Sequence, residues 1–203
     1  MDQQAATLLS TLKRPAVNSD SKINALNGLK SDIKHYRVPE SAQATIFECL
    51  KLAITQQTSS QLVASAFSTL GHLIKRLSIQ DASGHAIQQL APRLFGALQD
   101  RLGDPREPIR ANASQVLSEL YPYLGADVER IVRDEAMTGS NARAKETAMQ
   151  WVVRMHGEES MPFKSYVAPM VASLETRMEA YARRRRMHWW SCLAARVIAR
   201  RPT

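Results

Sequence analysis

The feature that most constrains the fold of this chain is the spacing of its apolar residues, which recur at intervals of three and four along almost the whole sequence. That spacing places apolar side chains on one face of an α-helix, and no stretch shows the strict alternation of a half-buried β-strand. Short clusters of proline, glycine, asparagine and serine interrupt the pattern at regular distances, as helix ends and caps do. The sequence therefore predicts an all-α protein with helices at 2–13, 20–35, 39–54, 58–79, 84–102, 106–121, 125–138, 141–156 and 163–180.

Two of the expected turn-and-helix units have nearly the same sequence. GDPREPIRANASQVL (103–117) is followed by GSNARAKETAMQWVV (139–153), so that Arg110 aligns with Lys145. Paired helices that repeat at about 35 to 47 residues are typical of HEAT-type repeats. We therefore expect an α-solenoid of helical hairpins, because stacking is how such repeats bury their apolar faces. In that arrangement the turns within the hairpins lie along one edge, at 14–19, 55–58, 103–106 and 138–141.

The sequence contains no pattern that indicates catalysis or cofactor binding. The five histidines form no HExxH motif, the two cysteines (Cys49 and Cys192) lie far apart without a CxxC partner, and no glycine-rich phosphate loop is present. We expect neither an enzyme nor a metal, cofactor or small-molecule site. Trp151 is interpreted as a core residue in preference to a ligand platform. The absence of a signal peptide and of long apolar runs favours a reducing, cytoplasmic setting.

The net charge of +8 is concentrated at one end of the sequence. Seven arginines and no acidic residue follow Glu179, which leaves residues 1–179 with a net charge of only +1. We therefore divide the chain into a repeat domain, 1–179, and an atypical basic tail, 180–203, that leaves the last hairpin incomplete. The preferred interpretation of the tail is an out-of-frame or intron-derived end. The alternative is a genuine amphipathic segment that binds acidic lipid, nucleic acid or the acidic tails of tubulin.

Several longer stretches carry a resemblance to a known family: LVASAFSTLGHLIKRL, RLGDPREPIRANASQVL, ADVERIVRDEAM, NARAKETAMQWVVRMH and PFKSYVAPMVASLE. Over about residues 5–175 the chain is similar to the N-terminal TOG domain of a fungal CLASP, a family of microtubule-stabilising proteins. The resemblance implies a solenoid of HEAT repeats whose intra-repeat loops face tubulin. It also implies a cytoskeletal setting at the mitotic spindle, the kinetochore and the nucleus, and no enzymatic activity.

The same resemblance implies which residues bind tubulin. They are Lys13, Arg14, Gln56, Gln57, Arg106, Arg110, Asn141, Arg143 and Lys145. Tubulin is acidic, so cations on a rigid edge would steer and orient it. Tubulin-binding polymerase TOG domains have a tryptophan in the first loop, whereas KRPAVNS has none. The alternative is a HEAT-type scaffold or adaptor that binds a kinetochore protein, or nucleic acid through the tail, without contacting tubulin.

Deletion of residues 180–203 tests the division of the chain. We expect the melting temperature to change by no more than a few degrees, because the four consecutive arginines at 183–186 repel one another and no acid offsets them. Any salt-sensitive binding to nucleic acid or anionic lipid should be lost with the tail. Calorimetry of the full and shortened chains measures the first effect. Unfolding of the shortened chain would show instead that the tail caps the solenoid.

Overall fold

The computed structural model describes residues 1–57, 59–159 and 161–175, and within them the chain forms helices and turns without a β-strand. The chain divides into two compact units, Met1–Met161 and Pro162–Thr203. In the second unit the structure describes residues 162–175, of which 164–175 are helical. The predicted all-α class is confirmed. The proposed tail at 180–203 and the end of the last expected helix lie outside the described residues.

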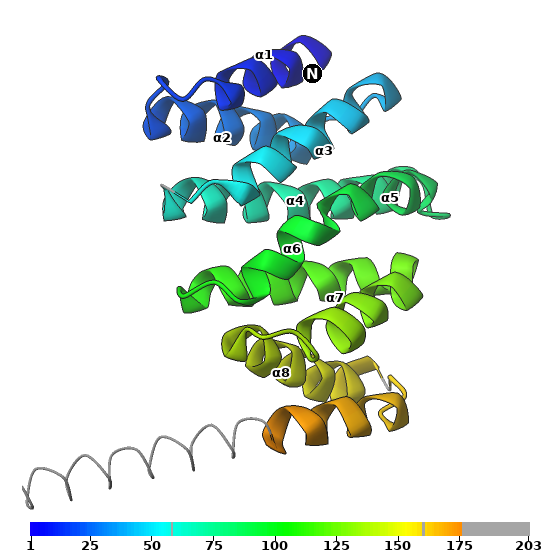
Figure 1. Cartoon of the computed structure of the whole chain (residues 1–203). Coiled ribbons are helices and arrows are strands. Elements are labelled where there is room, and N and C mark those ends of the chain that lie inside the picture. The colour runs from blue at the N-terminus through cyan, green and yellow to red at the C-terminus, as the bar shows by residue number, and fades with distance from the viewer. Residues whose placement is uncertain (58, 160, 176–203) are drawn as a thin grey trace, which may run out of the picture. The chain divides into compact units, whose positions relative to one another are not determined.

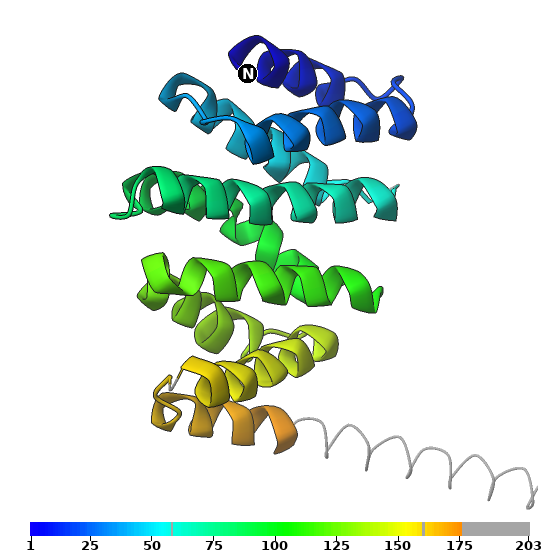
Figure 2. The ribbon, with the colours of Figure 1, turned by 180° about the vertical axis from the view of Figure 1, so that it is seen from behind.

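The helices of the first unit stack in two layers (Figure 1). In chain order they are α1 (Asp2–Lys13), α2 (Ser19–His35), α3 (Glu40–Thr55), α4 (Ser60–Gln80), α5 (His85–Leu90), η1 (Ala91–Leu94), α6 (Phe95–Leu102), α7 (Glu107–Arg130), η2 (Ile131–Ala136) and α8 (Ala142–Glu159). Figure 2 shows the layer formed by α2, α4, the first part of α7 and α8. The remaining helices form the other layer, and the two layers share one apolar core.

Side-chain caps explain why α2 and α4 begin where they do. Asn18 precedes α2, and its Oδ1 accepts a hydrogen bond from the Ser21 main-chain N–H at 2.8 Å. Ser59 precedes α4, and its Oγ accepts from the Leu62 N–H at 3.2 Å. Each cap satisfies a donor that the first turn of a helix leaves unpaired. The polar clusters that signal turns in the sequence therefore act as helix starts in the structure.

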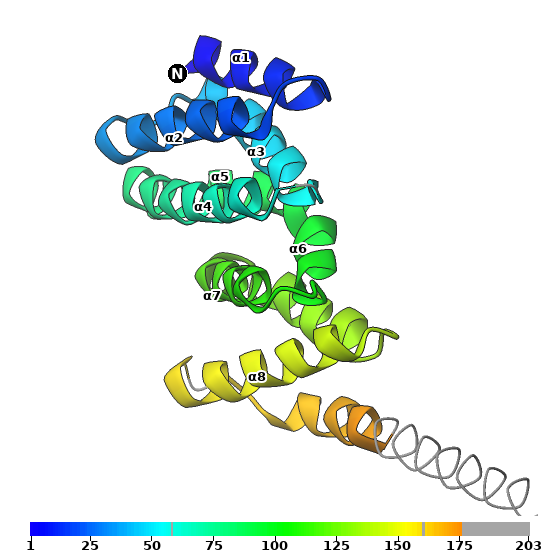
Figure 3. The same cartoon turned by 90° about the vertical axis from the view of Figure 1, so that its left-hand side faces the viewer.

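The turns within the hairpins lie on one side of the first unit, at the left in Figure 1 and at the right in Figure 3. They connect α1 to α2, α3 to α4, α6 to α7 and η2 to α8, whereas the connections between hairpins lie on the opposite side. This is the arrangement predicted for a HEAT-type solenoid. We call these residues the turn edge: 14–18, 56, 57, 59, 103–106 and 137–141.

The structure differs from the expected helix boundaries at two places, for identifiable reasons. The helix expected at 84–102 is divided by the 3₁₀ segment η1, which contains Pro92. Proline has no N–H to donate, so it interrupts the α-helical hydrogen bonding. The break expected between 121 and 125 is a kink inside α7, where Leu124 has φ −136° and ψ 35° beside Pro122. The chain then continues into the π-helical segment η2 without a separate turn.

The core contains the residues that the apolar spacing selects. Trp151 is 1% exposed, donates its Nε1–H to Ser118 Oγ at 3.0 Å and meets Tyr121 edge to face, with 5.8 Å between the ring centroids. It is a core residue, as predicted. Cys49 is buried, its thiol donates to the Ala5 carbonyl oxygen, and burial raises its pKa to about 12. This thiol is therefore held protonated and structural.

Gly84 gives a direct test of the connection between α4 and α5. Its φ is +68°, and a Cβ at this position would lie 2.3 Å from Cδ1 of Tyr123. We expect Gly84→Ala to lower the free energy of unfolding by about 1–2 kcal/mol or more, because the residue gains both strain and a clash. Gly96→Ala is the matched control, since a Cβ there meets nothing within 4 Å. That control should stabilise the protein by up to about 1 kcal/mol in denaturant unfolding. Equal effects of the two substitutions would contradict this description of the connection.

Candidate partner-binding edge

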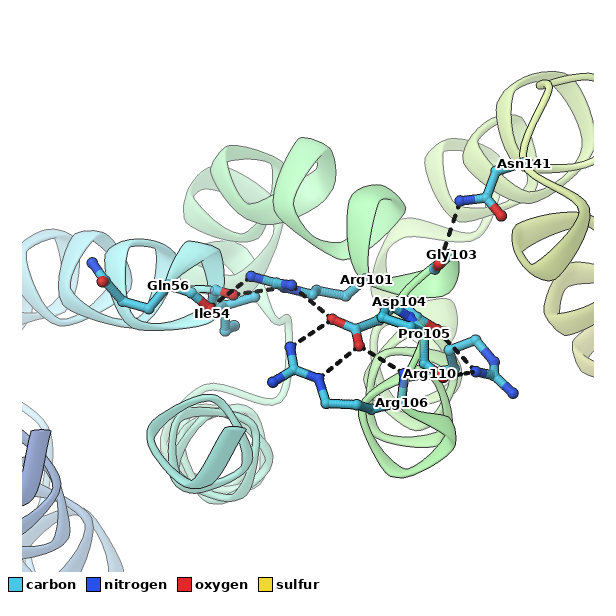
Figure 4. A network of polar contacts seen from close by, with 9 residues as sticks. All are labelled: Ile54, Gln56, Arg101, Gly103, Asp104, Pro105, Arg106, Arg110 and Asn141. Atoms are coloured by element: carbon cyan, nitrogen blue, oxygen red, sulfur yellow. Dashed lines mark hydrogen bonds and ion pairs between the residues drawn. The ribbon is translucent and has the colours of Figure 1, made fainter. Parts of the chain in front are cut away.

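Asp104 is the centre of the polar contacts at the turn edge (Figure 4). Its side chain is 1% exposed and accepts a hydrogen bond from Arg101 Nη1 at 2.7 Å. Arg106 donates three more, from its main-chain N–H, Nε and Nη2, each at 2.9 Å. A carboxylate is stable in the interior only where opposite charge and hydrogen bonds replace water. Both oxygens of Asp104 meet that condition, and their hydrogen bonds hold the third turn in place.

Arg101 extends this network to the neighbouring hairpin. Its Nε donates to the carbonyl oxygen of Ile54 at 2.8 Å, and its Nη2 donates to that of Gln56 at 2.9 Å. These carbonyls lie at the end of α3, where a helix has no acceptor partners of its own and favours a cation. Arg101 therefore caps α3 and joins the second hairpin turn to the third.

Asn141 makes the corresponding connection between the third and fourth turns. Its Nδ2 donates to the Gly103 carbonyl oxygen at 3.3 Å, while its Oδ1 accepts from the Arg143 main-chain N–H at 3.0 Å. Asn141 thus caps the start of α8 and holds it against the third turn. Within the third turn, Arg110 Nη1 donates to the Asp104 carbonyl oxygen at 2.9 Å. Three of the four turns are therefore connected through described side chains.

The charges of this network determine the protonation of its acid. Hydrogen bonds from Arg106, and then those from Arg101, hold the pKa of Asp104 well below its usual range, although burial opposes them. The same contact raises the pKa of Arg106. A carboxyl pKa that is lower in the folded state stabilises the fold above the unfolded value of about 3.9. That stabilisation is lost as the pH falls through the folded pKa, so the network is intact at neutral pH.

The residues predicted to bind a partner differ in exposure. Five of them are exposed: Lys13, Arg14, Gln57, Asn141 and Arg143. The other four are half-buried: Gln56, Arg106, Arg110 and Lys145. Accessibility is lower at Arg106 and Arg110, which the resemblance places among the tubulin-binding residues. Both guanidinium groups fold back onto the third turn, because the buried Asp104 and the turn carbonyls need donors.

Sequence reasoning did not select the two residues on which the edge depends. Arg101 lies in the last turn of α6, and Asp104, three residues later, is the acid of the Asp-Pro turn. A cation and an acid at this spacing face each other on a helix surface. The sequence therefore indicated that Arg101 and Asp104 could pair, but only the fold shows that Arg101 reaches the end of α3.

Beside the network lies a hollow of about 690 Å³ whose polar lining includes Thr55, Gln57 and Arg106.

Two further observations concern other classes of function. Among the described residues, no group of three or more histidine, cysteine, aspartate or glutamate side chains is arranged to hold a metal ion. No described helix combines the length and the apolar character needed to cross a membrane. The hollow at the turn edge is open and polar. The described residues present a row of turns at the surface.

Stacked helical hairpins that present a linear row of turns define an α-solenoid binding module. The family model described as CLASP N terminal matches residues 1–176, and the chain belongs to this family. It is 45% identical over 175 residues to "Protein STU1" of Phaeosphaeria nodorum and 42% identical over 175 residues to "Protein stu1" of Aspergillus oryzae. Each match covers 86% of this chain but only 14% and 15% of those relatives.

A solved structure supports the fold independently. The chain is similar to the structure titled "Crystal Structure of MAST/Orbit N-terminal domain", with a TM-score of 0.67 and 17% sequence identity. The match covers 83% of this chain and 72% of that one. At this identity the similarity shows the shared TOG-type helical solenoid and no more. Since the chain spans about one seventh of its curated relatives, the activity of the whole protein is a separate question.

Replacement of Asp104 tests the network. We expect Asp104→Asn to lower the free energy of unfolding by about 3 kcal/mol at neutral pH, because Arg101 loses its buried counter-charge. Asp100→Asn is the matched control, since that acid is exposed one turn earlier in α6 and should change stability by less than about 0.5 kcal/mol. Denaturant unfolding at neutral pH and in strong acid measures both. The difference between the parent and Asp104→Asn should shrink in acid as Asp104 protonates, and a constant difference would contradict the assignment.

Proposed function

We propose that the turn edge binds tubulin, and that the chain is a non-catalytic, microtubule-associated binding module that stabilises dynamic microtubules. The observation that carries this proposal is the alignment of four hairpin turns on one edge of the first unit (Figures 1 and 3). Membership of the CLASP family supports the microtubule as the partner. A row of turns in register suits one extended protein surface, because each turn adds a contact at a fixed spacing.

The side-chain network supports the proposal because it fixes the turns before a partner arrives. Arg101 joins the second turn to the third, and Asn141 joins the third to the fourth. Binding costs less conformational entropy when the contacting loops are already ordered. Arg106 and Arg110 therefore contribute to binding mainly by holding the third turn, although part of each side chain remains accessible.

The cations that remain for a partner lie toward the two ends of the edge. Lys13 and Arg14 in the first turn and Arg143 at the start of α8 are exposed, and none is in an ion pair within the described residues. The positive charge of Arg106, by contrast, is offset by Asp104. We infer that attraction to acidic tubulin comes chiefly from the first and fourth turns, with Gln57 available for hydrogen bonds and Asn141 holding the fourth turn in place.

The cellular setting follows from the same proposal. A microtubule-associated module of this family would act in the cytoplasm on the cytoskeleton, and in dividing cells at the spindle, the kinetochore and the nucleus. The second candidate is a HEAT-type adaptor that binds a kinetochore protein without contacting tubulin. The first turn favours this alternative, because residues 14–18 include no large aromatic side chain to act as an anchor.

Charge reversal at the two ends of the edge tests the proposal. Arg14→Glu combined with Arg143→Glu should weaken co-sedimentation with microtubules by about tenfold in apparent affinity, more at low ionic strength, because two attractive charges become repulsive. Both residues are exposed, so the melting temperature should change by no more than a few degrees. Arg37→Glu combined with Arg93→Glu is the matched control. It makes the same change in net charge at exposed residues that line a hollow at the connections between hairpins.

The control matters because a protein of net charge +8 is attracted to any polyanion. If both double variants lose binding equally, the attraction depends on net charge and the turn edge is not the contact. If neither loses binding, the adaptor function is favoured over tubulin binding. Loss in the first variant alone supports the turn edge.

A further inference from the structure

A second group of cations lies on α2 and α4, two helices of the layer that Figure 2 shows. It consists of Lys30 and Lys34 of α2 and His72 and Lys75 of α4, which we call the lysine patch. Lys34 and Lys75 are exposed, and Lys30 and His72 are half-buried. Neither the turn edge nor the polar network of Asp104 includes these residues. The patch therefore requires an explanation of its own.

Contacts between the two helices fix the geometry of the patch. Near the start of α4, Ser65 Oγ donates to Asn27 Oδ1 at 2.8 Å. Farther along, Arg76 Nε donates to the Ile33 carbonyl oxygen at 2.8 Å, and its Nη2 donates to the carbonyl oxygen of Lys34. These contacts hold α2 and α4 side by side in a fixed register. The side chains of the patch are thereby gathered on one surface by the fold.

The positive charge of the patch is not compensated. None of its three lysines forms an ion pair within the described part of the chain. Burial lowers the pKa of His72, and the positive charges of Lys34, Lys30 and Lys75 lower it further. All three lysines are therefore close enough to His72 to act on its charge. Asp32 lies two residues from both Lys30 and Lys34, a spacing that directs it away from them on the helix.

Glu119 of α7 is the acid on the other side of the patch, and it is not paired with the cations. Its Oε1 accepts from Gln115 Nε2 at 3.3 Å, and its Oε2 is buried without a hydrogen-bond partner among the described residues. The Oε2 atom lies against Gly71, 3.2 Å from where a Cβ would be. A hollow of about 340 Å³ separates α4 from α7 here, and His72, Lys75 and Glu119 contribute to its lining.

Local helix electrostatics accounts for only part of the patch. Lys34 lies in the last turn of α2, where the helix dipole favours a cation. Lys30 lies a full turn earlier, and the last turn of α4 has no basic residue. The accumulation of cations across two helices is therefore not explained by capping. It is characteristic of a surface that attracts an anionic partner.

We propose that the lysine patch binds an acidic, flexible polypeptide segment, at a site separate from the turn edge. Lysines four residues apart on a helix are separated by about 6 Å along its axis. Carboxylates on alternate residues of an extended chain are separated by about 6.6 Å, so the two spacings match. The hollow between α4 and α7 gives such a segment room beside the cations. A nucleic acid fits less well, because the neighbouring Arg76 already donates to main-chain carbonyls and the patch contains no phenylalanine, tyrosine or tryptophan as a stacking platform.

The distribution of lysines in the sequence allows a direct test on the full chain. A fluorescein-labelled decaglutamate peptide is bound and then coupled with a carbodiimide, which joins carboxylates to lysine amines but not to arginine. Residues 180–203 contain seven arginines and no lysine, so any binding by that segment is not recorded. Of the eight lysines in the chain, we expect Lys30, Lys34 and Lys75 to take most of the peptide. Labelling with a neutral amine-reactive ester corrects for differences in accessibility.

Variants provide the second readout. Lys34→Glu combined with Lys75→Glu should weaken binding of the peptide at least fivefold in fluorescence anisotropy at low ionic strength, on the order expected for two reversed surface charges. Arg14→Glu combined with Arg143→Glu is the control with the same change in net charge, and it should leave peptide binding within about twofold. The lysine double variant should weaken microtubule co-sedimentation less than the turn-edge double variant does. Failure of the turn-edge proposal would therefore be visible separately from failure of this one.

The results that overturn the proposal are also specific. Even coupling over all eight lysines, or coupling concentrated at Lys13 and Lys145, would show that the patch is not a site. Equal loss of peptide binding in the two double variants would show attraction to net charge alone. Tighter binding of a decauridylate RNA than of the peptide, lost in the lysine variant, would assign the patch to nucleic acid and reject the polypeptide.

Discussion

The burial of one carboxylate, Asp104, is the constraint on which the turn edge depends. The Asp104 side chain is only 1% exposed, so its negative charge must be neutralised within the protein. Arg101 neutralises it on one side and Arg106 on the other. Arg101 has donors left over, and these reach the end of the preceding hairpin. The arginine that neutralises the buried acid therefore also connects two neighbouring repeats. A solenoid needs such connections, because its repeats contact only their neighbours.

The same use of arginine recurs along the stack. Arg76 of α4 donates to the last carbonyls of α2, Arg101 of α6 to those at the end of α3, and Arg154 of α8 to the Ser114 carbonyl oxygen of α7. In each pair a guanidinium group from one hairpin binds the main chain of the hairpin before it. Arginine suits this role because its planar group has several donors in fixed directions and stays charged when partly buried. Lysine lacks this planar group, and no lysine forms an ion pair among the described residues.

The contrast between local patterns and contacts that join distant residues explains what the sequence could and could not predict. Apolar spacing and turn clusters predicted the helices and the common edge of the turns, because both depend on local patterns that burial reinforces. Trp151 was predicted as core for the same reason. The division of one helix at Pro92 was missed, although its cause is local, because the apolar spacing continues through it. The role of Arg101 was not predictable from charge alone, since its main-chain partners Ile54 and Gln56 lie 47 and 45 positions away in the sequence. Arg106 binds Asp104 only two positions away, but the sequence does not show that this acid is buried.

Two of the accessible groups of cations carry the proposals above, one at the ends of the turn edge and one in the lysine patch. α2 connects them, since it begins at the first turn and carries Lys34 in its last turn. At about 1.5 Å per residue its 17 residues place the first turn about 25 Å from the end of the helix that carries Lys34. An extended chain covers that distance in about eight residues. A partner seated on the turn edge could therefore reach the patch only through a flexible acidic segment of at least that length, and tethering would raise the effective concentration of that segment at the patch. Two weak electrostatic contacts joined in this way would bind one partner more tightly than either could alone, and both would weaken together as ionic strength rises.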